Sequence, residues 1–410
     1  MNKEKHIPQG YKDSPLGIIP KEWDVKRLGD FCVFFSGGTP RSGTPSYYNG
    51  TIPFIRSGEI NQDKTELFLS QEGLDNSSAK FVKEGDILYA LYGANSGQCS
   101  LSKINGVINQ AILCIRPNAN PYFLMSILLL NKNHYYNAYL QGGQGNLSGE
   151  IVSNYKIALP SIEEQEHICS VLQLWDTAIE KQSELIEKLK LRKRALMQKL
   201  LTGKKCLPGF YGEWKRIKLG DIAERITRKN EEDNKNVVTI SAQRGFVVQT
   251  DFFNKSVASE TLDNYYLVHK DEFCYNKSYS NGYPMGAIKR LTVFDKAVVT
   301  TLYICFKLKE LSNINIDFFE QYCESGIFNK ELVKVANEGG RAHGLLNVTP
   351  SDFFNMHMGI PSIEEQNAIA TVLVNADKEI GLANKKLASF QSQKRGLMQK
   401  LLTGKKRINS

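Results

Sequence analysis

The sequence predicts an α+β fold in which two mixed α/β domains are separated by two long helices that pair as an antiparallel coiled coil. The stretch from Pro160 to Lys205 recurs from Pro361 to Lys406, with about half of the paired positions identical. Both copies carry apolar residues at alternating steps of three and four, which is the spacing of a coiled-coil seam. The segments before the two copies also match each other, so we expect one globular domain to precede each helix.

The apolar seam occupies equivalent positions in the two copies. Its members are Ile168, Leu172, Trp175, Ile179, Ile186, Leu189, Leu196 and Leu200, matched by Ile369, Leu373, Ala376, Ile380, Leu387, Phe390, Leu397 and Leu401. Both helices have clear boundaries. Ser161 and Ser362 are suitable N-caps, each with a glutamate three residues later that completes a capping box. Gly203 and Gly404 stand at the position where a C′ glycine ends a helix.

A helix of about 40 residues is about 60 Å long at 1.5 Å per residue, so it can act as a spacer. Because the chain must return across the second domain before it begins the second helix, we expect the two helices to run antiparallel. The extended arm before Pro20 is then expected to follow the second helix in space, as Cys206 to Gly212 follows the first helix in sequence. This is a pseudo-two-fold cyclic arrangement.

Four segments follow from the repeat: a first domain with its N-terminal arm, a helix, a second domain, and a second helix with a tail. Their boundaries are 1–158, 159–205, 206–359 and 360–410. Matching words, Glu22–Asp30 and Glu213–Asp221, open the two domains. Strands are predicted at Gly106–Pro117 and Lys296–Lys307, and helices at Pro121–Leu140, with Asn120 as N-cap, and at Ile316–Ala336.

Composition limits the classes of protein that fit. With 410 residues and 41% hydrophobic content, the chain can form two or three domains with real cores. The longest apolar run, Phe123–Leu130, is much shorter than the ~20 residues needed to cross a bilayer, so a cytoplasmic location without membrane contact is expected. The eight cysteines form no CxxC pair, which argues against a zinc site or a disulfide framework. The net charge of +9 suggests a nucleic-acid partner, although most of the excess lies in residues 360–410.

The repeated PSIEEQ word, the repeated LMQKLLTGKK word and the two dissimilar domains together resemble the specificity subunit of a type I restriction-modification system. The resemblance covers essentially the whole chain. It implies two target-recognition domains, each of which binds one half of a bipartite site in double-stranded DNA, and two conserved helices that set the distance between half-sites. It also implies assembly with two methyltransferase subunits and with two restriction motor-nuclease subunits. S-adenosylmethionine, ATP and magnesium would then be used by those partners.

The residues agree with that division of labour. The chain has no GxxxxGK[ST] phosphate loop, no DPPY or NPPF tetrapeptide and no convincing GxGxxG after a strand. We therefore expect no catalytic residues, cofactor site or metal site in this chain. Two alternatives remain open: a non-catalytic coiled-coil scaffold with two protein-binding heads, and a stand-alone DNA methyltransferase or nuclease with unrecognised motifs.

Candidate DNA-reading residues are amide, guanidinium, hydroxyl and aromatic side chains in polar, glycine-rich loops, since these groups pair with base edges or phosphates. Surface turns alone would explain many of them. In the first domain they are Arg41, Tyr47, Arg56, Ser57, Tyr92, Asn95, Ser96, Gln98, Gln144 and Asn146. In the second domain they are Arg225, Arg228, Gln243, Arg244, Lys277, Tyr279, Asn281, Tyr283, Arg341, His343 and Asn347.

The ends of the two helices are more alike than a coiled-coil seam requires. Two copies of one methyltransferase that dock on equivalent surfaces would explain this likeness, and so would a recent duplication. The predicted partner-binding residues are Glu164, Gln165, Met197, Leu200 and Leu201, with Glu365, Gln366, Met398, Leu401 and Leu402 in the second copy.

Overall fold

A computed structural model describes residues 7–139, 146–204, 207–252, 262–310, 313–338 and 346–408. The chain divides into two compact units. Unit 1 comprises residues 1–182 together with 386–410, and unit 2 comprises residues 183–385. The two long helices each contribute to both units.

Those helices are α5 (Ile162–Leu200) and α11 (Ile363–Leu401), each 39 residues long. The hydroxyl of Ser161 accepts a hydrogen bond from the Glu164 backbone N–H at 3.3 Å, and Ser362 does the same for Glu365. Gly203 and Gly404 have φ angles of 68° and 69°, the left-handed conformation that ends a helix without a Cβ clash. The predicted starts and stops of both helices are therefore confirmed.

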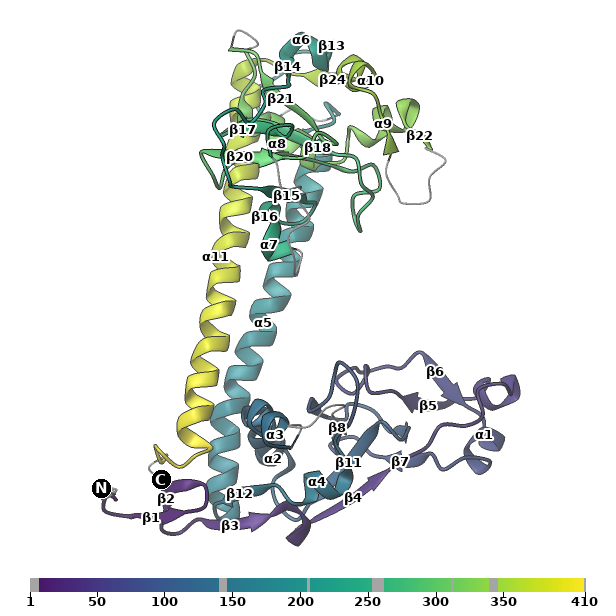
Figure 1. The fold of residues 1–410 in the computed structure, drawn as a ribbon, viewed down its shortest axis with the longest axis vertical. Helices are drawn as coiled ribbons and strands as arrows, with labels where there is room; N and C mark the ends of the chain where they lie inside the picture. Colours follow the sequence, from purple (N-terminus) through teal and green to yellow (C-terminus); the bar gives the residue numbers. More distant parts are fainter. Residues whose placement is uncertain are drawn as a thin grey trace. The chain divides into compact units, whose positions relative to one another are not determined.

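In unit 1, two four-stranded sheets and short helices form the globular head (Figure 1). One sheet has the order β4 (Cys32–Ser36), β11 (Ile112–Pro117), β8 (Ile87–Ala90), β9 (Cys99–Leu101). The other has the order β6 (Leu67–Leu69), β5 (Ile52–Ile55), β10 (Gly106–Ile108), β7 (Lys80–Val82). Two short ladders complete the unit: β1 (Tyr11–Ser14) with β2 (Gly17–Pro20), and β3 (Asp24–Arg27) with β12 (Lys156–Leu159).

Unit 2 repeats this topology. Its main sheet has the order β14 (Ala223–Ile226), β21 (Ile304–Leu308), β18 (Phe273–Asn276), β19 (Ala287–Arg290). The pair β15 (Val238–Ser241) and β16 (Gly245–Val248) is joined to the pair β17 (Tyr266–His269) and β20 (Lys296–Val299) by a parallel bridge between Val237 and Val298. β13 (Lys215–Lys218) pairs with β24 (His357–Ile360), as β3 does with β12.

Short helices connect the strands. In unit 1 they are η1 (Leu28–Asp30), η2 (Pro45–Tyr48), α1 (Gln71–Asp75), α2 (Pro121–Leu130), α3 (Lys132–Tyr139) and α4 (Gly149–Ser153). In unit 2 they are α6 (Leu219–Ile222), α7 (Gln249–Phe252), α8 (Ile316–Glu324), α9 (Asn329–Val335) and α10 (Pro350–Asn355), with a small ladder of β22 (Asn337–Glu338) and β23 (Leu346–Asn347).

Four predicted elements are present but interrupted. The predicted strand Gly106–Pro117 is β10 and β11, which belong to different sheets and are separated by a turn in which the Asn109 side chain accepts from the Ala111 N–H. The equivalent stretch Lys296–Lys307 divides in the same way into β20 and β21. The predicted helix Pro121–Leu140 is divided into α2, which ends at Leu130, and α3, which begins at Lys132. Its last predicted residue, Leu140, lies outside the described ranges.

The predicted helix Ile316–Ala336 is also two helices, α8 and α9, with Gly326 between them at φ 74°. A left-handed residue cannot continue a right-handed helix, so the chain turns there. The N-cap prediction for the corresponding helix of unit 1 is confirmed, because the Asn120 side chain accepts from the backbone N–H groups of Tyr122 and Phe123.

The core of each unit contains residues from both long helices. In unit 1, Ile168 and Leu172 of α5 share one apolar cluster with Leu401 at the end of α11, with the following Leu402 and with Trp23. In unit 2 the two helices exchange places: the start of α11 and the end of α5 share one apolar cluster. Its members include Ile369, Leu373, Met197, Leu200 and Leu201. The end of each helix is thus buried with the start of the other, as a cyclic arrangement requires.

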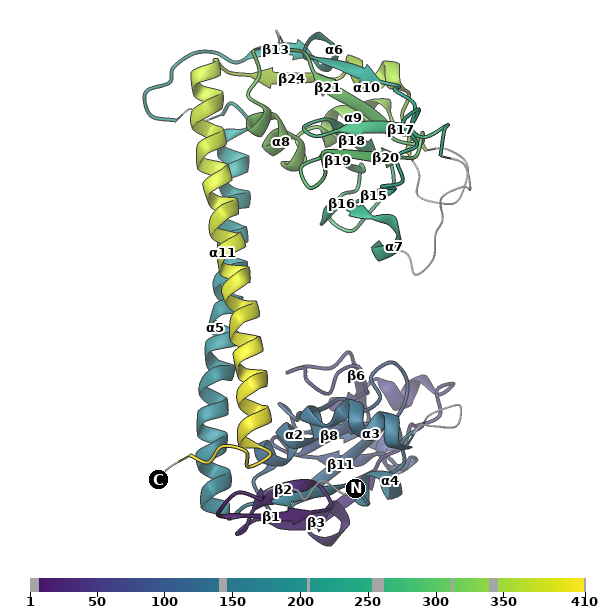
Figure 2. The same ribbon diagram turned by 60° about the vertical axis from the view of Figure 1, so that its left-hand side comes forward.

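The helices run antiparallel in each unit. In unit 2, Lys193 of α5 is paired with Asp377 of α11 at 2.6 Å, and in unit 1 the repeat-equivalent pair joins Asp176 to Lys394. Figure 2 shows α5 and α11 side by side, and the rings of Trp175 and Phe390 meet edge to face at 5.7 Å in unit 1. The predicted coiled coil is confirmed, and lysines interrupt its seam at equivalent places.

Candidate nucleic-acid interface

In both heads, two loop segments lie close together. One joins the third and fourth strands of the main sheet in the order given above, and the other follows a strand of the second group of strands. In unit 1 these segments are the β8–β9 loop and the residues after β5. A pocket joins them, lined by Ser57 from the second segment and by Asn95 and Gln98 from the first. The sequence predicted all three side chains, and the structure brings them together. Asn61 lines the same pocket and was not predicted, because it stands in a turn without a glycine-rich loop.

Unit 2 brings the equivalent segments together through hydrogen bonds. The Gln243 amide, which follows β15, donates to the carbonyl of Asn281 in the β18–β19 loop at 2.9 Å. The Asn276 amide at the end of β18 donates to the Ile240 carbonyl at 3.1 Å. Because β15 and β18 correspond to β5 and β8, the two heads place polar side chains at one topological location. Their side chains differ, so the two locations can recognise different ligands.

The other predicted residues divide by exposure. Ser96 is buried, and its hydroxyl donates to the Leu91 carbonyl at 3.1 Å, so it shapes the loop from within. The half-buried predicted residues are Tyr47, Arg56, Ser57, Tyr92, Arg228, Lys277 and Tyr283. The exposed ones are Arg41, Asn95, Gln98, Asn146, Arg225, Gln243, Arg244, Tyr279, Asn281 and Asn347. Gln144, Arg341 and His343 lie outside the described residues.

Arg56, a strong candidate by residue type, is held by two carboxylates. Its guanidinium contacts Glu59 at 2.9 Å and Glu66 at 2.5 Å. Burial alone would raise the pKa of the Glu59 carboxyl, but hydrogen bonds from Arg56, from backbone N–H groups and from Thr65 together lower it to about 2. The pair therefore stays ionised and positions the chain after β5. Contact of Arg56 with DNA remains a prediction.

Arg228 and Tyr283 also have internal partners. The Arg228 guanidinium contacts the nearly buried Glu272 at 2.9 Å and donates to the Leu267 carbonyl at 3.1 Å. The Tyr283 hydroxyl donates to Glu324 at 3.0 Å, and desolvation by burial is the main reason that its pKa is raised. Desolvation likewise lowers the pKa of Lys277. These contacts give Arg228 and Tyr283 a structural role that residue type alone does not reveal.

The family described as type I restriction modification DNA specificity domain matches this chain twice, over residues 20–191 and residues 211–391. The chain belongs to this family. It is similar to the specificity subunit of the type I restriction enzyme MjaVIII from Methanocaldococcus jannaschii, with 23% identity over 96% of this chain and 95% of that protein.

Two solved structures share the fold of this specificity subunit. The S subunit of a type I restriction-modification system from M. genitalium has a TM-score of 0.54 at 16% identity, covering 93% of this chain and 96% of that chain. A chain from a structure on complex assembly and conformational transition of the type I R-M system has a TM-score of 0.55 at 14% identity, covering 94% and 99%.

The repeated helix ends of the specificity subunit have a structural explanation that the sequence did not indicate. Gln165 is 1% exposed: its side-chain oxygen accepts from the backbone N–H of the helix cap Asn120 at 2.9 Å, and its amide donates to the Pro160 carbonyl. Gln366 is equally buried and makes the same two bonds to Asn315 and Pro361. Each glutamine joins a long helix to the start of a neighbouring helix.

The predicted partner-binding role of the helix ends therefore needs correction. The side chains of Met197, Leu200, Leu201, Leu401 and Leu402 are buried in the apolar cores of the units, as are Gln165, Glu365 and Gln366. Packing inside each unit accounts for the repetition of these residues. Glu164 and Met398 are half-buried, and the Glu164 carboxylate is already bound by Trp23 and Arg407. Contact of either residue with a partner remains a prediction.

No group of three or more histidine, cysteine or acidic side chains in the described ranges could hold a metal ion. The described helices include none that is long and apolar enough to cross a membrane. Cys274 and Cys305 are both buried, with their sulfur atoms 3.3 Å apart.

Proposed function

We propose that the two heads of this type I specificity subunit bind the two halves of a bipartite sequence in double-stranded DNA. Each head would read its half-site with the loop between the last two strands of its main sheet and with the residues after β5 or β15. The observation that carries the proposal is that both heads assemble polar side chains at this one location, from different residues. Amide groups suit this task, because Asn and Gln can pair with adenine by two hydrogen bonds.

The helices α5 and α11 would set the gap between the half-sites. A helix of 39 residues is about 58 Å long, and two heads on one face of a duplex reach sites about one helical turn apart. The exposed faces of the same helices would dock two methyltransferase subunits, and two restriction motor-nuclease subunits would complete the assembly.

In this division of labour the specificity subunit is non-catalytic and holds no cofactor. Methylation would use S-adenosylmethionine on the methyltransferase, and DNA translocation and cleavage would use ATP and magnesium on the motor-nuclease. Because its substrate is chromosomal or invading DNA, the complex would work in the cytoplasm.

Methylome sequencing of cells that express the chain with its methyltransferase tests the proposal. We expect one methylated motif made of two defined half-sites with a fixed gap. A single continuous motif, or no motif, would contradict it. The purified chain alone is the control, because methylation or cutting by that sample would favour the stand-alone enzyme instead.

A further inference from the structure

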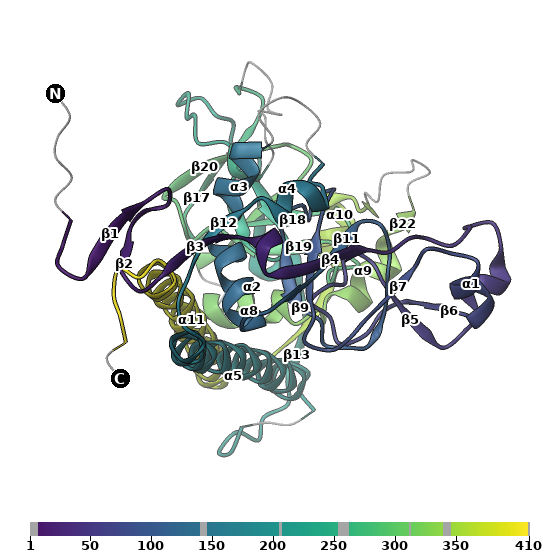
Figure 3. The same ribbon diagram turned by 90° about the horizontal axis from the view of Figure 1, so that it is seen from below.

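In unit 1, Arg407 in the tail after α11 forms ion pairs with Glu22 and Glu164. Arg407 presents Nε and one terminal nitrogen to the two oxygens of Glu164, at 2.9 and 3.0 Å, and its other terminal nitrogen to Glu22 at 2.8 Å. The indole N–H of Trp23 donates to Glu164 at 3.0 Å. We call these four residues the clasp. Figure 3 shows the end of α11 beside the β1–β2 hairpin, where the Tyr11 hydroxyl donates to the Gly404 carbonyl.

Unit 2 keeps the acidic residues of the clasp. By the register of the repeat, Glu365, Glu213 and Trp214 correspond to Glu164, Glu22 and Trp23. The counterpart of Arg407 is Cys206, which lies outside the described residues. The repeat therefore retains two carboxylates and an indole where the sequence has no arginine.

Two polar atoms of this set lack partners among the described residues. Glu365 is only 2% exposed, and its Oε1 atom is buried without a hydrogen bond. The indole nitrogen of Trp214 is also buried without a hydrogen bond, although its counterpart in unit 1 bonds to the equivalent carboxylate. Buried polar groups are almost always satisfied, so such a pair needs an explanation.

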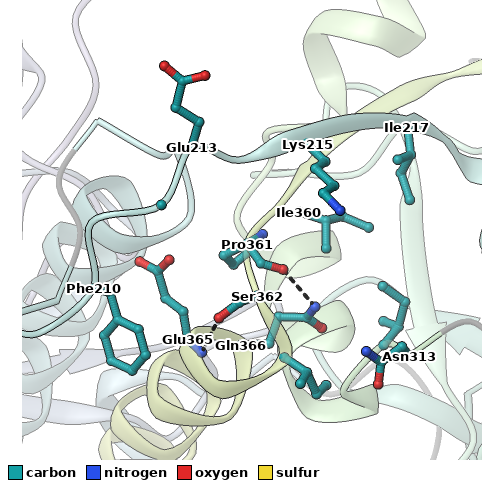
Figure 4. A pocket seen from close by; sticks show the side chains of 13 residues that line it. Phe210, Glu213, Lys215, Ile217, Asn313, Ile360, Pro361, Ser362, Glu365 and Gln366 are labelled. Carbon is teal, nitrogen blue, oxygen red and sulfur yellow. Dashed lines mark hydrogen bonds between the residues drawn. The ribbon is translucent and has the colours of Figure 1, made fainter.

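The unsatisfied carboxylate faces a pocket. Figure 4 shows this pocket with Glu365 and Phe210 in its wall, while Glu213 stands at its edge with its exposed carboxylate turned away from the pocket. Lys215 lines it as well, but no ion pair joins Lys215 to either glutamate. The pocket thus presents the buried carboxylate of Glu365, the counterpart of the Glu164 carboxylate that binds Arg407 in unit 1, beside a ring that can cover a flat cation.

We propose that this pocket of unit 2 is a binding site for a guanidinium group. A guanidinium is planar and presents paired N–H groups that match both oxygens of a carboxylate, which an ammonium ion cannot do. Bound there, it supplies the missing hydrogen bond to Glu365, as Arg407 does for Glu164 in unit 1. The ligand is either an arginine side chain of a partner subunit or a free guanidinium compound.

Fluorine NMR on the full-length chain labelled with 5-fluorotryptophan tests the site. The chain has three tryptophans, and Trp214 adjoins Glu213, so its resonance is assigned with Trp214→Phe and followed during titration with L-argininamide. We expect the Trp214 resonance to shift and saturate, with L-lysinamide binding at least about tenfold more weakly. No saturable shift, or equal affinity for both compounds, overturns the proposal.

Two variants make the result specific. Glu365→Gln should lose the response to argininamide, and Glu364→Gln, an exposed neighbour on the same helix, should keep it. Circular dichroism checks that both variants are folded. A folded Glu365→Gln protein that binds argininamide as the wild type does would also refute the site.

A second arm identifies the source of the guanidinium. Assembly of the chain with its methyltransferase is measured with and without argininamide at saturating concentration. Competition assigns the ligand to an arginine of the methyltransferase, and unchanged assembly assigns it to a free compound. If the wild-type chain fails to assemble at all, the proposed function fails while the titration still decides the site.

Discussion

At the scale of single residues, the ion-pair partner of a side chain decides whether it can act on a ligand. Arg56 and Arg228 each contact a nearly buried glutamate, whereas Asn95 and Gln98 remain exposed beside a pocket. Residue type predicted arginine as the strongest reader of DNA. The structure shows that Arg56 and Arg228 are engaged inside their own units, whereas Arg41 and the amides of Asn95 and Gln98 are exposed.

Replacing Glu59 with glutamine tests the structural role of Arg56. The folded pKa of Glu59 is about 2, below the ~4.3 of an unfolded chain. The carboxylate therefore stabilises the fold above pH ~4.3, and this contribution is lost as the pH falls towards 2. Glu59→Gln should lower the free energy of unfolding by about 2 kcal/mol at pH 7. Urea denaturation should show that the difference in free energy of unfolding between the wild type and the variant shrinks as the pH falls from about 4.5 to about 2.5. A difference that does not change with pH would contradict this.

Changing Asn95 and Gln98 together to alanine tests the proposed DNA-reading loop. Each amide that pairs with a base contributes about 1–3 kcal/mol of discrimination, so affinity for the first half-site should fall by at least about tenfold. Fluorescence anisotropy on the assembled methyltransferase complex, with either half-site altered, measures this. Asn118→Ala, exposed just after β11, is the matched control. An equal loss of DNA affinity in the control and in the double variant would contradict the assignment of Asn95 and Gln98 as DNA contacts.

At the scale of elements, one hydrogen-bonding device recurs in both units. A buried glutamine in the first turn of each long helix accepts from the N-cap residue of α2 or α8. This contact sets where the long helix leaves its head. It explains why the PSIEEQ word recurs without any reference to a partner protein.

Gln366→Ala should therefore destabilise unit 2. The change leaves the Asn315 N–H and the Pro361 carbonyl without their partner, at a cost of about 2–3 kcal/mol. Gln165→Ala should cost unit 1 a similar amount, and the exposed Asn375→Ala should cost less than about 0.5 kcal/mol. Hydrogen exchange of backbone amides measures the stability of the two units separately. If the α8 amides of the Gln366→Ala variant exchange as slowly as those of the wild type, the glutamine contact does not stabilise unit 2.

At the scale of the whole molecule, the first and last described segments of the chain meet within unit 1. The segment after α11 contacts the N-terminal head, and Arg407 joins Glu22 and Glu164 there. The equivalent junction in unit 2 is made by the continuous chain between α5 and β13. An ion-pair clasp in one unit and a peptide linkage in the other thus close the same cycle.

A circular permutant tests this closure. Joining the native termini and opening the chain near Lys205 exchanges the covalent junction for the non-covalent one. We expect a folded protein whose DNA affinity in the methyltransferase complex stays within about threefold of the wild type, because both junctions occupy equivalent positions. Circular dichroism and anisotropy measure fold and affinity. An unfolded product would show that the two junctions are not interchangeable.

The sequence by itself determined the elements whose causes are local. The repeat, the apolar seam, the serine caps and the terminal glycines predicted both long helices, because their signals lie within a few residues of the structure they specify. Strand stretches and loops were also placed, but breaks at Asn109 and Gly326 were not, since a single turn changes composition very little.

Only the tertiary structure decided which side chains are available to act. Arg56 is paired with Glu59 and Glu66, which are near in sequence, but only the fold of the chain after β5 brings their carboxylates to the guanidinium. Leu201 is buried by the packing of a whole unit. The helix ends look like a docking surface in sequence, yet they are interior, because two chain segments far apart bury them together. The unsatisfied Glu365 was equally invisible, since a missing hydrogen bond is a property of three-dimensional surroundings and not of a motif.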